Sequence, residues 1–320
     1  MIVTLTPNPS NDRTVTLGHR LERGAVQRAE SVLSQAGGKG VNISRAAIAA
    51  GIPSIAVLPA PKDDPFVHEL LAAGIDCRPV EHDGGPLRVN ITISEPDGTT
   101  TKLNSPGPSA TPQMLAALTE SLRRRAASAD WVVLAGSLPP DAPVEWYADL
   151  VTVLRRTSAC VAVDTSDAPL RALAERLPES APHLMKPNGE ELASFTGGDA
   201  AVLESDPDAA AAAARTLVER GVATVLVTLG ANGAVLVTEA GAWHATPPPT
   251  EVVSTVGAGD CSLFGYLLGD IRQRTPDQRL ALAVAYGSAA AGLPGTTIPH
   301  PSQVRTELVS VRGLTITQGG

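Results

Sequence analysis

Residues 254–267 read STVGAGDCSLFGYL. The turn Gly257-Ala258-Gly259 leads straight into an apolar run, which predicts a helix from Asp260 to Leu268. A helix that opens on such a turn directs free backbone N–H groups and the positive end of its dipole at one place, which favours an anion such as phosphate. Asp260 would itself repel phosphate. It fits there as a base that accepts a hydroxyl proton during phosphoryl transfer, or alternatively as an ordinary helix N-cap.

Elsewhere in the chain, short apolar runs rich in β-branched residues alternate with helical stretches. We expect strands at Ile2–Leu5, Ser54–Leu58, Trp131–Leu134, Cys160–Val163, Val225–Thr228 and Ala234–Val237. We expect helices at Lys39–Ala50, Pro65–Ala73, Pro112–Ala127, Pro143–Arg156, Ala209–Glu219, Asp260–Leu268 and Pro276–Ala291. This alternation predicts an α/β fold with a doubly wound, mostly parallel sheet flanked by helices.

Two segments, residues 13–34 and 87–103, leave this alternation. The second contains an alternating hairpin that turns at Asp97-Gly98 and has no helix beside it. We expect the two segments to form a small β-sheet that serves as a lid over a site at the strand ends. The whole chain, residues 1–320, then reads as a single domain with this lid.

Composition limits the classes of protein that the chain can represent. Its 320 residues are 43% hydrophobic and 18% charged, which excludes wholesale disorder. The net charge of −8 argues against nucleic acid or an anionic membrane as a partner. There is no apolar run of membrane-spanning length and no secretion signal at the N-terminus, so we expect a cytoplasmic protein. Three scattered cysteines, Cys77, Cys160 and Cys261, indicate neither a disulfide framework nor a zinc site.

Lysine is rare in this chain. Only four of the 25 basic residues are lysine, and three of these lie in the segments GGKGVN, TKLNSPGP and KPNGEEL. A compact ammonium group differs in kind from the guanidinium that supplies most of the positive charge here. We therefore interpret Lys39, Lys102 and Lys186 as candidate site residues.

The segment Gly37–Asn42 is a second glycine-rich turn that leads into a helix. The Walker A pattern is GxxxxGK followed directly by Ser or Thr. This segment does not match it, because Lys39 is followed by Gly40 and Val41. The dinucleotide pattern GxGxxG after a strand is also absent, so a nicotinamide-dependent enzyme has little support.

Five motifs follow one another along the chain: GGKGVN at 37–42, GSLPP at 136–140, KPNGEEL at 186–192, TLGANGA at 228–234 and STVGAGDCSLFGYL at 254–267. Their order and spacing resemble the ribokinase-like, phosphofructokinase B family of sugar kinases over essentially the whole chain. The opening TPNPSNDRTV, the strand RVNITI and the segment TKLNSPGP are most similar to the branch that phosphorylates ketohexose phosphates. The resemblance implies a ribokinase-like kinase domain that uses ATP and Mg²⁺.

The resemblance also implies roles for the residues that match the family's motifs. Asp260 matches the general base, and the backbone of Gly257, Ala258 and Gly259 matches the anion hole. Asn188 and Glu191 match the NxxE motif that arranges Mg²⁺ and its waters. A plainer alternative for this last pair is a helix cap after Pro187.

The two substrates would lie on either side of this base. The residues that match the nucleotide side are Lys186, Asn188, Thr228, Gly230 and Gly233. Those that match the sugar side are Asp12, Gly38 and Asn42, with Ser137 as a further candidate contact. For Asp12 a turn residue after Pro9 is the simpler alternative.

An acceptor that already carries a phosphate needs local cations when it binds to an acidic protein. The residues that resemble the family's phosphate-binding cations are Lys39, Arg88 and Lys102, which we expect to cluster. A neutral acceptor would need none of them, so the cluster favours a phosphosugar over a nucleoside. The alternative for Arg88 and Lys102 is that they are charges at a strand edge that discourage aggregation.

Some residues depart from the family pattern. Cys261 stands where Ser or Thr usually follows the GAGD motif, Asn11 replaces an aliphatic residue, and 167–169 read DAP where a Gly-Glu pair is common. These changes leave the identity of the sugar open. Fructose 1-phosphate is the expected acceptor, and tagatose 6-phosphate and fructose 6-phosphate are alternative acceptors. A nucleoside kinase and a non-catalytic sugar-phosphate sensor are alternative functions. We also expect a homodimer formed through the lid, because a small exposed sheet has edges to cover.

Overall fold

The computed structural model describes residues 1–81 and 85–315, and its largest element is a ten-stranded sheet. The strand order is β14-β13-β12-β11-β10-β9-β8-β1-β4-β5. Neighbouring strands are parallel along the series β11-β10-β9-β8-β1-β4-β5. The remaining strands, β12, β13 and β14, pair antiparallel at the β11 side. The bounds are β1 Ile2–Leu5, β4 Ser54–Pro59, β5 Asp76–Val80, β8 Trp131–Ala135, β9 Cys160–Asp164, β10 Leu184–Met185, β11 Thr224–Thr228, β12 Ala234–Thr238, β13 Gly241–Thr246 and β14 Ser310–Leu314.

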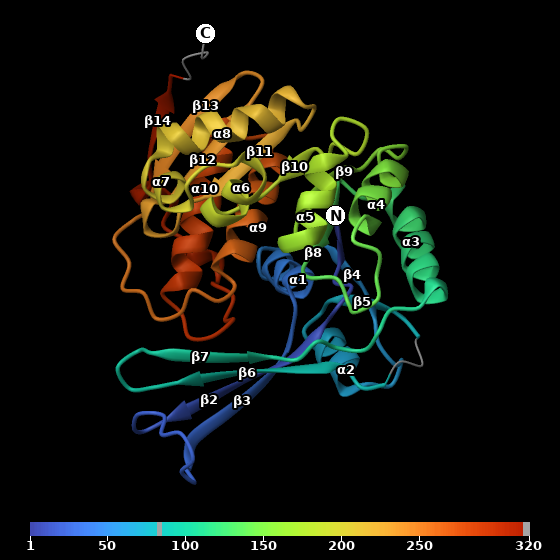
Figure 1. Ribbon diagram of the computed structural model, residues 1–320, viewed down its shortest axis with the longest axis vertical. Coiled ribbons are helices and arrows are strands. Elements are labelled where there is room, and N and C mark those ends of the chain that lie inside the picture. Colours follow the sequence, from blue (N-terminus) through green and yellow to red (C-terminus); the bar gives the residue numbers. More distant parts are fainter. Residues whose placement is uncertain (82–84, 316–320) are drawn as a thin grey trace.

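Helices cover both faces of this sheet (Figure 1). One face packs against α1 (Lys39–Ala49), α9 (Ala258–Ile271) and α10 (Pro276–Ala291), with α2 (Pro65–Ala72) beside α1. The other face packs against α3 Pro112–Ala126, α4 Trp146–Leu154, α5 Asp167–Glu175, α6 Gly189–Thr196 and α8 Pro207–Glu219, with α7 Ala200–Ser205 between α6 and α8. In the described ranges, no helix is long and apolar enough to cross a membrane.

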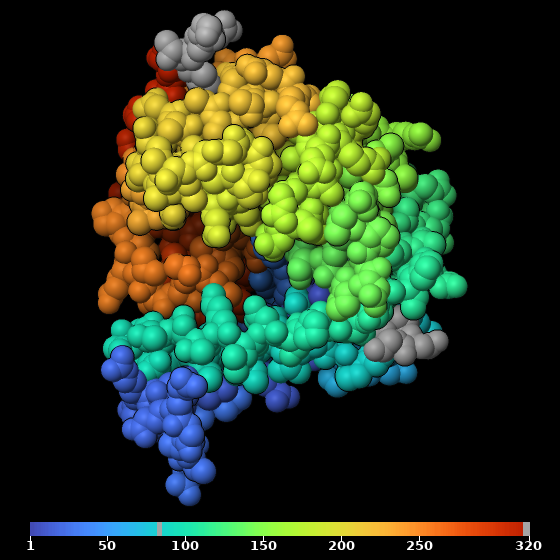
Figure 2. Space-filling model, viewed as in Figure 1, coloured from blue at the N-terminus to red at the C-terminus, as the bar shows by residue number. Residues whose placement is uncertain are grey.

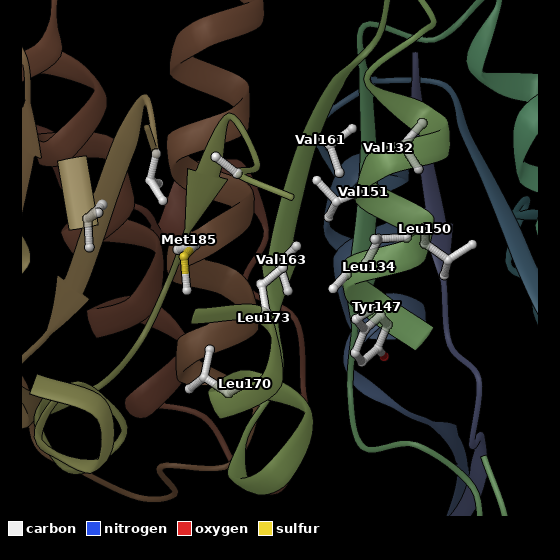
Figure 3. Close-up of a cluster of buried hydrophobic side chains, with 14 of the residues drawn as sticks. Val132, Leu134, Tyr147, Leu150, Val151, Val161, Val163, Leu170, Leu173 and Met185 are labelled. Atoms are coloured by element: carbon white, nitrogen blue, oxygen red, sulfur yellow. The ribbon is translucent and has the colours of Figure 1, made fainter. Parts of the chain in front are cut away.

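The central strands are apolar on both sides because both sides are covered. On β1, Ile2 packs into the core beneath α1 and α9, whereas Val3 and Leu5 pack into the core beneath α3 and α4. Figure 3 shows the second core, in which Val132 and Leu134 of β8 and Val163 of β9 face side chains of α4 and α5. The alternation of side chains along each strand thus supplies both cores, which confirms the predicted doubly wound α/β fold.

A topological switch point lies beside β1. From β1 the chain first builds outward on one side, to β4 and β5, and then returns to build β8, β9 and β10 on the other side. In open parallel sheets, ligands bind beyond the carboxyl ends of the strands at such a point. The ends of β1, β8, β9 and β10 are therefore the expected site.

A separate four-stranded sheet lies beside this end of the main sheet (Figure 1). Its order is β3-β2-β6-β7, with bounds β2 Ser10–Leu17, β3 Ala29–Gly37, β6 Arg88–Ser94 and β7 Thr100–Asn104. Figure 2 shows a hollow between the strip formed by the 88–104 hairpin and the α/β body. The predicted second sheet is confirmed, with its hairpin turn at Glu95–Thr99. Its role as a lid remains a prediction.

Several elements differ from those expected from the sequence. Strands β5, β10, β13 and β14 and the short helices α5, α6 and α7 were not predicted. β5 carries Asp76, Arg78 and Pro79, β10 has only two residues and β14 is mostly exposed. Helix α4 begins at Trp146, three residues after the proline that marked its expected start. Helix α9 begins at Ala258, so Asp260 lies inside the first turn and is not the N-cap.

Candidate active site

The turn before α9 is built to leave backbone N–H groups free. Gly257 is the N-cap and has φ 80°, a left-handed conformation that glycine adopts without strain. Cys261 N–H bonds back to the Gly257 carbonyl at 2.9 Å, so the N–H groups of Gly259 and Asp260 precede the first helical hydrogen bond, and Ala258 N–H makes only a long 3.4 Å bond to the Thr255 carbonyl. A Cβ added to Gly259 would lie 3.4 Å from Lys186 Nζ, which places an ammonium group against the turn. Free N–H groups and this ammonium together favour an anion here.

Asp260 is buried directly behind this turn, with 6% of its surface exposed. Asn42 Nδ2, on the second turn-to-helix segment, donates a 2.8 Å hydrogen bond to Asp260 Oδ2. Burial raises the pKa of Asp260 from 3.8 to about 6, with Asp164 adding to the rise while Lys39 and Asn42 oppose it. At neutral pH the carboxylate is therefore ionised but is a stronger base than an exposed aspartate, as a general base requires.

Asp164, at the carboxyl end of β9, is a fully buried carboxylate that the sequence analysis did not select. Lys39 Nζ contacts its Oδ1 at 2.7 Å and Lys186 Nζ lies 3.3 Å from its Oδ2. Burial alone would raise the pKa of Asp164, but Lys186 and Lys39 outweigh burial and lower it. For Lys39, Asp164 and Asp260 likewise outweigh burial and raise its pKa. Lys39 thus stays charged beside Asp260.

Asp12 lies on β2 of the second sheet, opposite Asn90 of β6. Ser10 Oγ and Asn90 Nδ2 donate to Asp12 Oδ1 at 2.7 and 3.1 Å. Burial raises the pKa of Asp12 although both hydrogen bonds lower it. A Cβ on Gly37 of β3 would overlap the Asp12 carboxylate, so Gly37 must be glycine for Asp12 to lie there.

Arg88 begins β6 and reaches toward the switch point. Its Nε donates to the Asn8 carbonyl at 3.1 Å, and its Nη2 lies 3.4 Å from Ser137 Oγ after β8. Burial lowers the pKa of Arg88, opposed by Asp12. Arg88 and the candidate contact Ser137 are thus brought together, beside the backbone of the segment that follows β1.

Lys39, Arg88 and Lys102, which were expected to cluster, have different partners in the structure. Lys39 is held on Asp164, because a fully buried carboxylate requires a cationic partner. Lys102 is exposed on β7 and pairs with Thr92, four residues along β6 from Arg88, or about 13 Å at the rise of a strand. The structure therefore joins Lys39 to Lys186 through Asp164, whereas Arg88 lies at the start of β6 with Asn8 and Ser137.

The candidate nucleotide side lies at the ends of β10 and β11. Asn188 forms an isolated bridge with Thr228, and the turn that follows contains Gly230 (φ 55°) and Gly233 (φ 88°). Asn188 and Glu191 form a capping box: Glu191 N–H donates to Asn188 Oδ1 at 2.7 Å and Asn188 N–H donates to Glu191 Oε2 at 2.9 Å. The helix-cap alternative for this pair is therefore realised in the structure.

The capping box bears on how a metal could bind. In residues 1–81 and 85–315, no three His, Cys, Asp or Glu side chains come together as a ready-made metal site. Glu191 keeps its Oε1 uncommitted, and burial raises the pKa of this carboxyl group. Mg²⁺ at kinase sites is typically held by one or two carboxylates together with substrate phosphates and water. The residues present thus fit Mg²⁺ in that manner.

A buried, basic carboxylate stands beside a turn that favours an anion, and a second sheet carrying Asp12, Asn90 and Arg88 lies at the same switch point. This arrangement is typical of an enzyme that transfers a phosphoryl group to a hydroxyl. The comparisons agree with this class. The chain belongs to the pfkB family of carbohydrate kinases, whose family model matches residues 10–303.

The relatives span nearly the whole chain. It is 36% identical over 311 residues to a 1-phosphofructokinase of Rhodobacter capsulatus, covering 95% of this chain and 94% of the relative. It is 31% identical to a 1-phosphofructokinase of Escherichia coli strain K12, covering 97% of each chain. Among solved structures, phosphofructokinase-2 from Escherichia coli in complex with substrates and products has a TM-score of 0.87 and 26% identity, covering 96% of this chain and 99% of that one.

Proposed function

We propose that this protein is a 1-phosphofructokinase, which transfers the γ-phosphoryl group of ATP to the C6 hydroxyl of fructose 1-phosphate and releases ADP. The observation that carries the proposal is Asp260, a buried carboxylate with a pKa of about 6, held by Asn42 beside the free N–H groups of the Gly257–Gly259 turn. The names of the relatives support the choice of acceptor.

In the proposed reaction, Asp260 accepts the proton of the C6 hydroxyl as that oxygen attacks the γ-phosphorus in line. The bond from phosphorus to the bridging oxygen breaks, and ADP leaves with its electron pair. The N–H groups of the turn and the ammonium of Lys186 stabilise the charge that develops on the transferred group. Lys39, charged and ion-paired to Asp164, keeps the pKa of Asp260 from rising further.

We assign the sugar side to the second sheet and the switch point. Asp12, whose Oδ2 is not used by Ser10 or Asn90, would accept from sugar hydroxyls, with Gly38 and Asn42 completing that side. Arg88 and Ser137 would bind the 1-phosphate through charge-assisted hydrogen bonds. Lys102 lies on the same face of the lid but farther toward its tip, and its part in the site is the weaker proposal.

ATP would lie along Thr228, Gly230 and Gly233, with Lys186 and Asn188 nearest the phosphates. We propose Mg²⁺ as the metal, held by Glu191 and Asn188 largely through water. When bound, it would neutralise charge on the β- and γ-phosphates. We also propose that the enzyme works in the cytoplasm, where ATP and sugar phosphates are available.

A fructose-6-phosphate kinase is the second candidate, because the solved structures most similar in fold include phosphofructokinase-2 from Escherichia coli in complex with fructose-6-phosphate, with a TM-score of 0.85. A coupled assay of ADP release with ATP and Mg²⁺ tests both candidates. Fructose 1-phosphate, fructose 6-phosphate, tagatose 6-phosphate and fructose are compared at equal concentration. A preference for fructose 1-phosphate supports the proposal, whereas a preference for another sugar phosphate transfers the assignment to that substrate.

A nucleoside kinase would leave Arg88 without a ligand, and a sugar-phosphate sensor would not need a basic, buried Asp260. ADP release with none of the four sugars, together with calorimetric binding of a sugar phosphate, would favour the sensor.

We further propose a homodimer formed through the lid. The strands and loops of this sheet carry four apolar side chains that are each more than half exposed: Val26, Val32, Leu33 and Leu103. Exposed apolar side chains that are grouped on one small element favour burial against a partner. Light scattering on a sizing column tests this, and a monomer that is fully active would contradict it.

A further inference from the structure

A second concave region lies at the far edge of the main sheet from β14, away from the candidate active site. It has a volume of about 710 Å³ and lies between α2, β5 and α3. α2 contributes Val67, His68 and Leu71, and α3 contributes Ala117, Glu120, Ser121, Arg124 and Arg125. Figure 1 shows α2 and α3 on either side of this edge. We call it the edge cavity.

Three guanidinium groups face the edge cavity: Arg78, Arg124 and Arg125. Asp76 pairs with Arg78 at 2.8 Å, and Glu120 is shared between Arg123 at 2.8 Å and Arg124 at 3.6 Å. Arg125 instead donates to the carbonyl and hydroxyl of Ser121, both at 2.9 Å. Asp63 and Glu81 line the cavity as well, so four cations, with Lys62, face three lining carboxylates and the lining carries a net positive charge.

Among the described contacts, Arg125 has no carboxylate partner. Burial, Arg78 and Arg124 all lower the pKa of Arg125, and Asp76 opposes them only weakly. Lys62 adds a fourth cation to the same cavity in a chain that has only four lysines. A bound anion would add countercharge beside Arg125 and complete the partners of Arg78 and Arg124.

The backbone and the apolar lining also suit such a ligand. Within residues 1–81 and 85–315, β5 is the last strand of the sheet and no strand pairs with its outer edge. Unpaired N–H groups at a sheet edge favour anions. Val67, Leu71, Pro79 and Val80 line the cavity beside the arginines. The volume is within the range of small-molecule sites.

We propose that the edge cavity is a binding site for a small organic polyanion, whose phosphate or carboxylate groups are held by Arg78, Arg124 and Arg125 and whose carbon skeleton packs on α2 and β5. This site is separate from the proposed active site and does not depend on the identity of the sugar substrate.

The position of α2 connects this cavity to the active site. Next to His68 on α2, Glu69 accepts the Ala36 N–H with both oxygens at 3.0 Å and binds Arg45 of α1 at 2.6 Å. Ala36 is followed directly by Gly37, Gly38 and Lys39. Occupancy of the edge cavity would therefore act on the helix that holds the junction between the second sheet and α1, and we expect it to change the KM for the sugar phosphate.

The test is isothermal titration calorimetry of the full chain with two probes, inorganic pyrophosphate and citrate. The variant is Arg124→Ser/Arg125→Ser, and the matched control is Arg123→Ser on the same helix, which does not line the cavity. An Arg88→Ser variant detects binding in the active-site cleft. Thermal unfolding shows whether each variant is folded, and kinase turnover without added probe is a second check for the Arg124→Ser/Arg125→Ser and Arg123→Ser proteins.

We expect at least one probe to bind the wild-type and Arg123→Ser proteins and to lose at least tenfold in affinity in the double variant. The tighter probe identifies phosphate or carboxylate as the recognised group. Equal affinity in all variants, no binding, or binding lost only in Arg88→Ser would each overturn the site. Binding that leaves the KM for the sugar phosphate unchanged would overturn the coupling through α2 alone.

Discussion

Replacing Asp260 with asparagine tests both the chemistry and the electrostatics of the site. Burial raises the pKa of Asp260 from 3.8 to about 6 in the folded protein, so the ionised carboxylate destabilises the fold. At 1.36 kcal/mol per pKa unit, the shift corresponds to about 3 kcal/mol of unfolding free energy. Because the folded-state pKa is raised, the stability is complete below pH 3.8 and is lost as the pH rises through about 6.

Asp260→Asn removes this destabilisation while keeping a side chain that can accept the 2.8 Å hydrogen bond from Asn42. We expect the variant to gain about 3 kcal/mol at pH 7.5, or about 6 °C in Tm, and nearly nothing at pH 4. The same variant should lower kcat on the order of 10²–10⁴-fold, because no base accepts the hydroxyl proton. ATP binding stays within a few-fold of the wild-type value.

The assays are calorimetric unfolding at pH 4 and 7.5, coupled ADP release, and nucleotide titration. Asp277→Asn is the matched control, an exposed aspartate in the first turn of the neighbouring helix α10. It should change neither Tm nor kcat appreciably. A folded Asp260→Asn protein with near-normal turnover would refute the role of the base, and an unchanged Tm at pH 7.5 would refute the electrostatic reasoning.

Three further predictions follow from the same geometry. As the pH falls below about 6, kcat/KM should drop about tenfold per unit because Asp260 becomes protonated; a flat profile down to pH 5 in a rate-versus-pH series would contradict this. Arg88→Ser should raise the KM for fructose 1-phosphate about 10- to 100-fold by removing charge-assisted hydrogen bonds, with the KM for ATP unchanged; Lys102→Ser, at an exposed position, should raise it less, and steady-state kinetics would show the order reversed if the assignment were wrong. Asp164→Asn should destabilise the protein by about 3 kcal/mol in urea unfolding near neutral pH, because Lys39 and Lys186 lose their shared carboxylate. Since the pKa of Asp164 is lowered in the folded protein, this difference in unfolding free energy should shrink as the pH falls below 3.8. A variant as stable as the wild type would argue against the ion-pair network.

Local patterns were sufficient for most of the fold. The strands at Ile2–Leu5 and Trp131–Ala135 are apolar on both faces, and the helices after Pro65, Pro112 and Pro276 carry local start signals. By contrast, β14 is mostly exposed, and it pairs with β13, which lies more than 60 residues earlier in the chain. This pairing is a long-range contact, and the hydrophobic pattern of residues 310–314 gives no sign of it.

The candidate site divides in the same way. The turn Gly257–Gly259 and Asp260 could be recognised from sequence because neighbouring residues create both the free N–H groups and the base. Asp164 could not, because its importance rests on two lysines that are 125 and 22 residues away in the chain. A useful signal was nevertheless present, since an aspartate ended an apolar strand, where a parallel sheet places its carboxyl-end side chains.

The amino-acid sequence by itself determined the α/β class, the second sheet, the glycine turn before α9 and the choice of Asp260 as the candidate base, because each depends on residues close together in the chain. Only the tertiary structure decided the grouping of the cations. Burial of Asp164 draws Lys39 and Lys186 together beside Asp260, while the strand register sets Arg88 and Lys102 about 13 Å apart along β6. Desolvation and register depend on how distant segments pack, and those two effects separate the catalytic side of the site from the side proposed to bind the sugar phosphate.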